Sequence, residues 1–249
     1  MALKTILNYS PNFNPKKRIF KQIKFIIFHY TGMKSESDAL NRLADLQSEV
    51  GCHYLIKNNE EIIKMVPDLY IAWHAGKSSW KNYRSLNQKS IGIEITNPGH
   101  EYGYKKFTQK QISSLLKLSR FLIKEYRINP KNILGHSDIA VERKKDPGEK
   151  FPWEYLSKNK IGIWHTLDKQ DLIKNRKLKI SKIEENNFFN NLFKVGYSKK
   201  YITNISKNKY LIELAKTFQR RFRQELVNGK IDQECLLISK SLVKAKVYN

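Results

Sequence analysis

Two histidines and one aspartate occupy positions from which their side chains could hold a metal ion. His29 ends the apolar run 24–30, His136 ends a second run at 132–136, and Asp146 follows ten residues later, before a Pro-Gly pair. Two neutral imidazoles and one carboxylate suit Zn²⁺, with a fourth position open for a water whose pKa the metal lowers to about 7. A lone histidine at a strand end is more often structural, but two of them followed by this aspartate favour a catalytic zinc site.

A carboxylate and an ammonium group could complete this site. Glu94 lies in an otherwise apolar strand and would act as a general base or acid toward the water; alternatively, it is a surface carboxylate on an edge strand. Lys144 lies two residues before the aspartate and could stabilise the negative oxygen of a tetrahedral intermediate. The alternative for Lys144 is a solvated cation in a basic run, and position in the sequence leaves both pairs of alternatives open.

Interleaved strands and helices would position these side chains. The expected elements are strands at 24–30, 91–96 and 132–136, a hairpin of 53–56 with 61–66, and helices at 36–49 and 108–126. The longer helix begins with a Thr-x-x-Gln capping box at Thr108 and carries its apolar residues on one face. This order predicts an α/β domain with a central mixed β-sheet flanked by helices. The carboxyl edge of such a sheet, where sites assemble, would carry His29 and His136.

The composition changes after about residue 165. All four tryptophans precede that point, and residues 166–206 are polar and rich in lysine and asparagine, which is typical of a linker with one short helix. An apolar stripe at 208–226 and a final helix capped by Asp232 predict a small all-helical C-terminal domain. The expected domains are an N-terminal extension (1–21), a catalytic domain (22–165), a linker (166–206) and the helical domain (207–249).

Composition excludes several classes of protein. The chain has 249 residues, 40% of them hydrophobic, which excludes a wholly disordered chain. No apolar run approaches the roughly 18 to 20 residues of a transmembrane helix. The two cysteines, Cys52 and Cys235, are too few for a disulfide framework or a four-thiolate zinc site. The N-terminus lacks the usual form of a signal peptide, so a cytoplasmic protein is the default expectation.

The net charge points to an anionic partner without identifying it. Lysine and arginine total 47 against 23 aspartates and glutamates, a formal charge of +24, and the excess extends along the whole chain. Such a charge suits nucleic acid, an anionic surface or an acidic polymer, or it reflects a compositional bias. Paired Cys/His spacings of a zinc finger are absent, so we expect no specific nucleic-acid partner. No feature of the sequence sets an oligomeric state.

Six short blocks in order make the first part of the chain recognisable. They are Phe28-His29-Tyr30-Thr31, Cys52-His53-Tyr54-Leu55-Ile56, Ala72-Trp73-His74-Ala75-Gly76, Ile91-Gly92-Ile93-Glu94-Ile95-Thr96-Asn97, Gly135-His136-Ser137-Asp138 and Lys144-Lys145-Asp146-Pro147-Gly148. Together they resemble the zinc-dependent N-acetylmuramoyl-L-alanine amidases of the type-2 class, which are kin of the peptidoglycan recognition proteins. The resemblance covers roughly residues 22–165.

The resemblance implies an activity and assigns roles to five residues. The family cleaves the amide between the lactyl group of N-acetylmuramic acid and the L-alanine of the stem peptide. On this resemblance His29, His136 and Asp146 are the zinc ligands, Glu94 is the catalytic carboxylate, and Lys144 helps to stabilise the oxyanion. The partner is then peptidoglycan or a muropeptide. A recognition protein that binds peptidoglycan without cutting it is the alternative, although such proteins commonly lack a ligand or the catalytic pair.

The resemblance also implies a substrate cleft. Tyr30, Trp73, His74 and Asn97 fall where the family lines that cleft, although Trp73 could equally be a core aromatic. His74 is expected to be a cleft-wall or structural residue rather than a fourth ligand. His53 lies inside a strand and is interpreted as a core residue or a neighbour of the ligands.

The C-terminal helices have a weaker likeness. Phe218-Gln219-x-x-Phe222, followed by Asn228-Gly229, is similar to the helical peptidoglycan-binding repeat that follows some of these amidases. The likeness implies a wall-docking role, and it makes the cell envelope or periplasm the alternative to a cytoplasmic location. The same stripe would otherwise be ordinary helix core.

Overall fold

A six-stranded mixed sheet forms the centre of the first part of the chain. The computed structural model describes residues 3–200 and 204–245. The strand order is β1-β5-β4-β9-β3-β10, and every neighbouring pair is parallel except the β4–β5 hairpin. The strands are β1 (Ile6–Leu7), β3 (Phe25–Tyr30), β4 (Tyr54–Ile56), β5 (Ile62–Lys64), β9 (Ser90–Ile95) and β10 (Ile133–Gly135). The sheet and its flanking helices confirm the predicted α/β class.

Strand β3 separates two layers of the protein. Side chains alternate across a strand, so Ile26 and Phe28 pack in one hydrophobic cluster while Phe25 and Ile27 pack in another. His29 continues the second set at the carboxyl end of the strand. Its register partner on β9 is Glu94, so both side chains leave the sheet on the same face.

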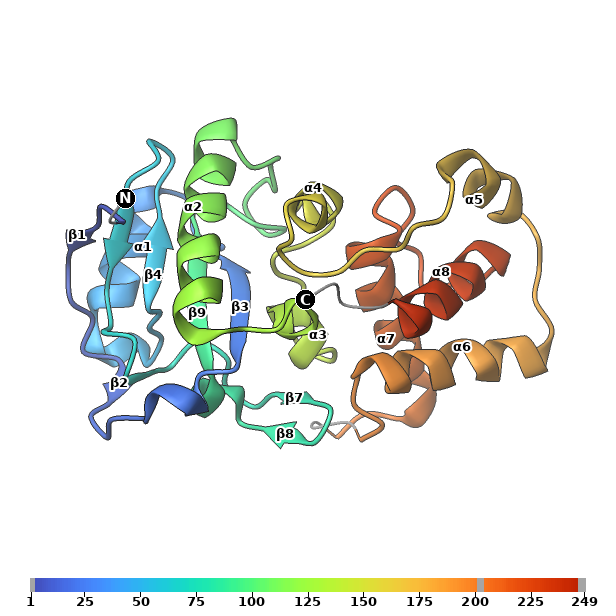
Figure 1. Ribbon diagram of the computed structural model, residues 1–249, viewed down its shortest axis with the longest axis horizontal. Coiled ribbons are helices and arrows are strands. Elements are labelled where there is room, and N and C mark those ends of the chain that lie inside the picture. The colour runs from blue at the N-terminus through green and yellow to red at the C-terminus, as the bar shows by residue number, and fades with distance from the viewer. Residues whose placement is uncertain (1–2, 201–203, 246–249) are drawn as a thin grey trace.

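Helices cover both faces of the sheet (Figure 1). Helix α2 (Gln109–Tyr126) packs on the Phe28 face and begins with the predicted capping box of Thr108. Helix α1 (Glu36–Ala44) packs on the other face, against β4 and β5. It is shorter than the predicted 36–49 because Asp45 is extended and its carboxylate accepts from the backbone N–H of Gln47, which begins the separate 3₁₀ turn η2 (Leu46–Ser48).

Four helices form the described residues of the C-terminal part, 169–200 and 204–245. They are α5 (Lys169–Asn175), α6 (Lys182–Val195), α7 (Lys207–Phe222) and α8 (Gln233–Lys244). The segment 166–206, expected as a linker with one short helix, therefore contains two helices. Phe188 and Leu192 of α6 are buried in the same cluster as Phe218 of α7 and Phe25 of the sheet. The helices consequently share a hydrophobic core with the first part of the chain.

A buried ion pair joins these helices to the end of β10. Short helices α3 (His136–Ile139) and α4 (Trp153–Lys158) lie on either side of the loop 140–152. Arg221 of α7 pairs with Asp138 of α3, and both side chains are almost fully buried. Arg221 also donates to the Ile133 carbonyl and lies over the Trp153 ring, 4.2 Å from its centroid. Helix α7 is thus fixed against the element that carries His136.

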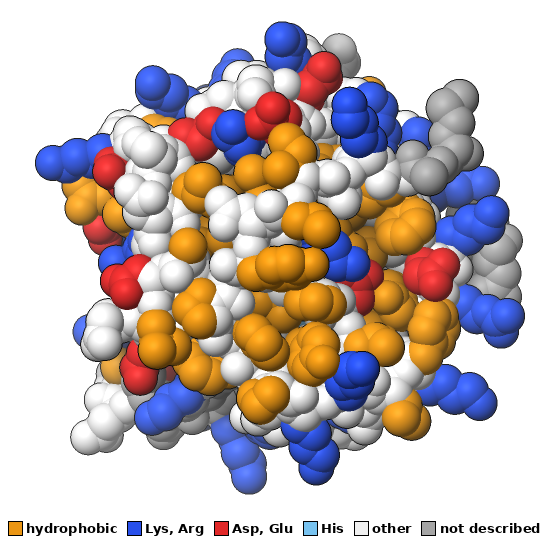
Figure 2. All heavy atoms as spheres, turned by 90° about the vertical axis from the view of Figure 1, so that its left-hand side faces the viewer, with side chains coloured by type: hydrophobic (Ala, Val, Ile, Leu, Met, Phe, Trp, Pro, Cys, Tyr) orange, Lys and Arg blue, Asp and Glu red, His pale blue; other side chains and the backbone are white. Residues whose placement is uncertain are grey.

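The N-terminal segment is built into the sheet domain. Strand β1 forms one edge of the sheet, and β2 (Phe13–Asn14) pairs with β6 (Ile71–Ala72). The β1 side of the molecule exposes many hydrophobic side chains with lysine and arginine at its periphery (Figure 2); Ile6, Leu7 and Tyr9 are among the exposed apolar residues. Across residues 3–200 and 204–245, no helix has the length and apolar character needed to traverse a bilayer.

Candidate active site

Three side chains from distant parts of the chain meet at the carboxyl ends of β3 and β10. The Nδ1 atoms of His29 and His136 are 2.9 Å apart, and Asp146 Oδ2 is 3.1 Å from each of them. All three residues are buried. Parallel pairing of β3 with β10 brings the two histidines together, and the loop after α3 returns Asp146 to the same edge. The predicted ligand set therefore converges.

Hydrogen bonds behind the cluster set which ring nitrogens carry protons. The Nε2 of His136 lies 3.2 Å from the Ala75 carbonyl, which can only accept, so this nitrogen carries the proton. The Ser90 hydroxyl donates to the Leu86 carbonyl and therefore accepts from His74 Nε2, 3.0 Å away. The Nδ1 of His74 is then bare and accepts from His29 Nε2, also at 3.0 Å. In this hydrogen-bond pattern each histidine would present its Nδ1 to a metal ion, because a metal ligand is a neutral imidazole.

This arrangement fits a divalent cation. Two imidazole nitrogens and a carboxylate oxygen converge on one point, and a single cation among them would bind all three. Burial, and next the neighbouring His136, lower the pKa of His29 to about 4, so its imidazole is neutral. Burial alone would raise the pKa of Asp146, but His136 and His29 hold it well below its usual range. Two imidazoles and one carboxylate are the donor set of a zinc site with an open fourth position, in which both rings would bind the metal in their neutral form.

Glu94 presents a buried carboxylate oxygen beside this cluster. One oxygen, Oε1, lies 4.0 Å from His29 Nδ1. The other, Oε2, is buried and has no hydrogen-bond partner among the described residues. Burial, followed by the nearby charge of Asp146, raises the pKa of Glu94 well above its ordinary value, and Lys144 opposes that rise. An unpartnered buried oxygen at this place is suited to a water or substrate proton.

The cluster lies in a cleft of about 570 Å³. Lys144 and Glu94 both line it, as do Tyr30, Trp73 and His74. Tyr30 donates from its hydroxyl to His100 Nδ1 at 2.8 Å, because His100 Nε2 must donate to the Glu149 carboxylate 3.1 Å away. The tyrosine is thereby held at the cleft wall.

Of the four residues expected to line the cleft, Asn97 lies outside it and His74 lines it while being almost fully buried. Asn97 is buried outside the cleft lining, where its amide donates to the Lys105 carbonyl and accepts from the Gly99 N–H. It braces the loop that carries His100. His74 lines the cleft but is 5% exposed, and its ring fits only because residue 92 is glycine: a Cβ there would lie 2.3 Å from the His74 ring. His53 is fully buried, as expected.

Sequence reasoning did not identify several members of this site. His100, Arg42 and Glu49 also line the cleft, and Ser90 orders the hydrogen bonds behind it. The first three lie in segments without a motif, so only the three-dimensional fold brings them to the cleft. Ser90 directly precedes the recognisable block Ile91–Asn97, and this position next to the block was the sequence feature that could have indicated its role.

Comparison with known proteins gives a consistent result. A family model described as N-acetylmuramoyl-L-alanine amidase matches residues 19–149. The chain is 32% identical over 237 residues to the N-acetylmuramoyl-L-alanine amidase AmiD of Escherichia coli K12, covering 90% of this chain and 84% of that protein. It is also 32% identical over 167 residues to the 1,6-anhydro-N-acetylmuramyl-L-alanine amidase AmpD of Haemophilus influenzae, covering 59% of this chain and 88% of that one.

Solved structures extend the likeness to the C-terminal helices. E. coli AmiD, in complex with anhydro-N-acetylmuramic acid-L-Ala-D-γ-Glu-L-Lys, superimposes with a TM-score of 0.78 at 30% identity, covering 93% of this chain and 92% of that one. AmpDh3 of Pseudomonas aeruginosa, in complex with an anhydromuramic pentapeptide, gives a TM-score of 0.76 at 28% identity, covering 92% and 93%.

Proposed function

The chain belongs to the N-acetylmuramoyl-L-alanine amidase family, and we propose that it performs the family's reaction with zinc held by His29, His136 and Asp146. It is a hydrolase that cleaves the amide between N-acetylmuramic acid, or its anhydro form, and the L-alanine of the stem peptide. The observation that carries the zinc proposal is the convergence of three potential ligand atoms beside the unpartnered oxygen of Glu94.

Hydrogen bonds behind the two histidines orient their rings so that they could bind the ion. Ser90 and His74 hold the proton of His29 on Nε2, and the Ala75 carbonyl does the same for His136. Such partners orient ligating imidazoles, and their loss typically reduces metal affinity 10–100-fold. When bound, zinc supplies a Lewis acid that polarises the scissile carbonyl and lowers the pKa of a water to about 7.

Glu94 transfers the proton, and Lys144 stabilises the negative charge that develops during the reaction. The Glu94 carboxylate accepts a proton from the attacking water and then delivers it to the alanine nitrogen as the amide breaks. Its burial favours the protonated form, which prepares it to return the proton after attack. The Lys144 ammonium group, at the same cleft wall, offsets the negative charge that develops on the carbonyl oxygen.

The assay follows release of a tripeptide from anhydro-N-acetylmuramyl-L-Ala-D-γ-Glu-L-Lys by mass spectrometry. We expect turnover by the purified chain, loss of turnover with a zinc chelator, and recovery when zinc is added back. A chain that binds the muropeptide but releases no peptide with zinc present would instead be a recognition protein.

Substitution of Glu94 separates catalysis from metal binding. Glu94→Gln keeps the shape of the side chain, so we expect retained zinc and a loss of about 10²- to 10⁴-fold in turnover. Glu61→Gln is the matched control, because Glu61 pairs with Lys57 in the turn between β4 and β5 and its loss should leave turnover unchanged. Wild-type turnover in Glu94→Gln would refute the assignment of the base.

A further inference from the structure

The carboxylate of Asp146 lacks the support that the two ligand histidines have. Hydrogen bonds to His74 and to the Ala75 carbonyl orient the rings of His29 and His136 from behind. Among the residues that the structure describes, the Asp146 carboxylate has no hydrogen-bond partner other than these two rings. Its direction therefore depends on the backbone that carries it.

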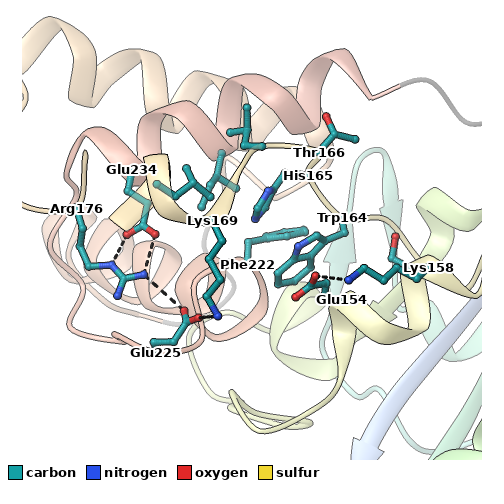
Figure 3. Close-up of a pocket in the computed structure, with 14 residues that line it drawn as sticks. Glu154, Lys158, Trp164, His165, Thr166, Lys169, Arg176, Phe222, Glu225 and Glu234 are labelled. Atoms are coloured by element: carbon teal, nitrogen blue, oxygen red, sulfur yellow. Dashed lines mark hydrogen bonds and ion pairs between the residues drawn. The ribbon is translucent and has the colours of Figure 1, made fainter. Parts of the chain in front are cut away.

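Contacts on both sides attach the loop between α3 and α4 to the rest of the protein. The Ser137 N–H of α3 donates to the Asp146 carbonyl at 2.9 Å. After the loop, α4 lies beside the C-terminal helices and shares the walls of a pocket with them (Figure 3). Gln224, which follows α7, donates to the carbonyl of buried Phe151 at 2.7 Å. Residues 147–150 lie between these attachments.

Tyr104 contacts this middle section from the connection between β9 and α2. Its hydroxyl donates to the Pro147 carbonyl at 2.6 Å and accepts from the Lys150 N–H at 3.0 Å. The Lys150 ammonium group donates to the Tyr104 carbonyl, also at 2.6 Å. One phenol thus binds the loop at two backbone positions, and the first of them directly follows the proposed metal ligand.

The loop leaves room for this hydroxyl. Gly148 has a φ of +84°, and a Cβ at that position would lie 2.4 Å from the Tyr104 hydroxyl oxygen. The Tyr104 ring stacks on His100 with 4.5 Å between ring centroids, and His100 Nε2 donates to Glu149 at 3.1 Å. Burial raises the pKa of Tyr104 above its ordinary value, so the hydroxyl keeps the proton that it donates.

We propose that Tyr104 is a positioning residue for the metal site, because its hydroxyl fixes the backbone after Asp146 and thereby directs the carboxylate toward the two imidazoles. This role rests on the proposed function, which assigns zinc to His29, His136 and Asp146. His100, on the same connection as Tyr104, lines the cleft. The connection therefore holds a wall of the cleft and the ligand loop in one arrangement.

Competition with a chromogenic chelator measures zinc affinity in the full-length protein without substrate. Tyr104→Phe keeps the ring and removes both hydroxyl bonds, so we expect about 10- to 100-fold weaker zinc binding, the loss typical when partners behind a ligand are removed. Tyr126→Phe is the matched control, because Tyr126 is also partly buried, donates to Asp68 at 2.8 Å and does not line the cleft. Its zinc affinity should equal that of the wild type.

Two further measurements separate positioning from a general loss of stability. Zinc-free Tyr104→Phe and Tyr126→Phe should have similar melting temperatures, and excess zinc should restore most of the kcat of Tyr104→Phe. In an Asp146→Ala background, Tyr104→Phe should change zinc affinity by less than about twofold, because the ligand that it directs is absent.

Lys150→Met tests the same contact even if Tyr104→Phe fails to fold. It removes the ammonium bond to the Tyr104 carbonyl and should weaken zinc binding severalfold. The loss of a positive charge would by itself favour a cation, so weaker binding reports the lost contact.

Three results would overturn the role of Tyr104: zinc affinity of Tyr104→Phe within about twofold of wild type, an equal loss in Tyr126→Phe, or the same fold loss in the Asp146→Ala background. A wild-type protein that binds zinc at this site but releases no stem peptide would refute the amidase proposal alone, because zinc affinity is measured without substrate. A wild-type protein that binds no zinc would refute the proposed zinc site and this role with it.

Discussion

Replacement of Arg221 by methionine tests whether the buried ion pair between α7 and α3 stabilises the fold. Methionine keeps a long side chain in α7 but removes the cation that faces Asp138. Breaking a buried ion pair by removing one partner costs about 3–5 kcal/mol. Asp138 would keep two donors, the Tyr197 hydroxyl at 2.7 Å and the Gly135 N–H at 2.8 Å, so we expect the lower end, about 3 kcal/mol.

The change in melting temperature follows from the size of the chain. For 150–250 residues, each kcal/mol shifts Tm by about 2–4 °C, so Arg221→Met should lower Tm by about 6–12 °C. Circular dichroism during heating measures it. Arg84→Met is the matched control, because exposed Arg84 donates, among the residues that the structure describes, only to the nearby Lys81 and Tyr83 carbonyls; its effect should stay within about 0.5 kcal/mol. A Tm of Arg221→Met within 2 °C of the control would refute the reasoning.

Three other perturbations have defined outcomes. His74→Phe removes the acceptor behind His29 and should weaken zinc retention about 10–100-fold, measured by competition with a chromogenic chelator; unchanged retention would show that His74 does not orient the ligand. Lys144→Met should lower kcat about 10²–10³-fold at full zinc content, and an unchanged kcat would remove Lys144 from the mechanism. Burial, and next Arg18, lower the pKa of His53 to about 3. Between about pH 6.5 and 3, residue 53 is therefore protonated in the unfolded state but not in the folded state. As the pH is lowered through this range, this residue reduces the free energy of unfolding by about 1.4 kcal/mol per pH unit. Chemical denaturation of chelator-treated His53→Gln should show a shallower loss below pH 6.5 than wild type, and parallel curves would contradict the assignment.

Local patterns in the sequence predicted the parts of the site that depend on single strands and caps. The alternation of Ile91–Thr96 placed Glu94 opposite the isoleucines, and the structure pairs it in register with His29. The Thr108 capping box began α2 as expected. These features were predictable because they depend on neighbours two to four residues away.

Features that depend on distant contacts were not predictable in the same way. Asp138 and its partner Arg221 are 83 residues apart in the sequence. The residues next to each of them form no pattern that predicts the ion pair. Helix α6 was missed because Phe188, Phe189 and Leu192 lie among asparagines, although Ser181 and Glu184 form a capping box that signalled its start. Burial against α7 and α8 stabilises that helix more than its own composition does.

The most direct test of the account is a crystal structure with diffraction data recorded on both sides of the zinc absorption edge. We expect one anomalous peak per chain, within about 2.0–2.2 Å of the Nδ1 atoms of His29 and His136 and of an Asp146 oxygen. Zinc bound at other residues, or no zinc in a protein that still releases stem peptide, would contradict it.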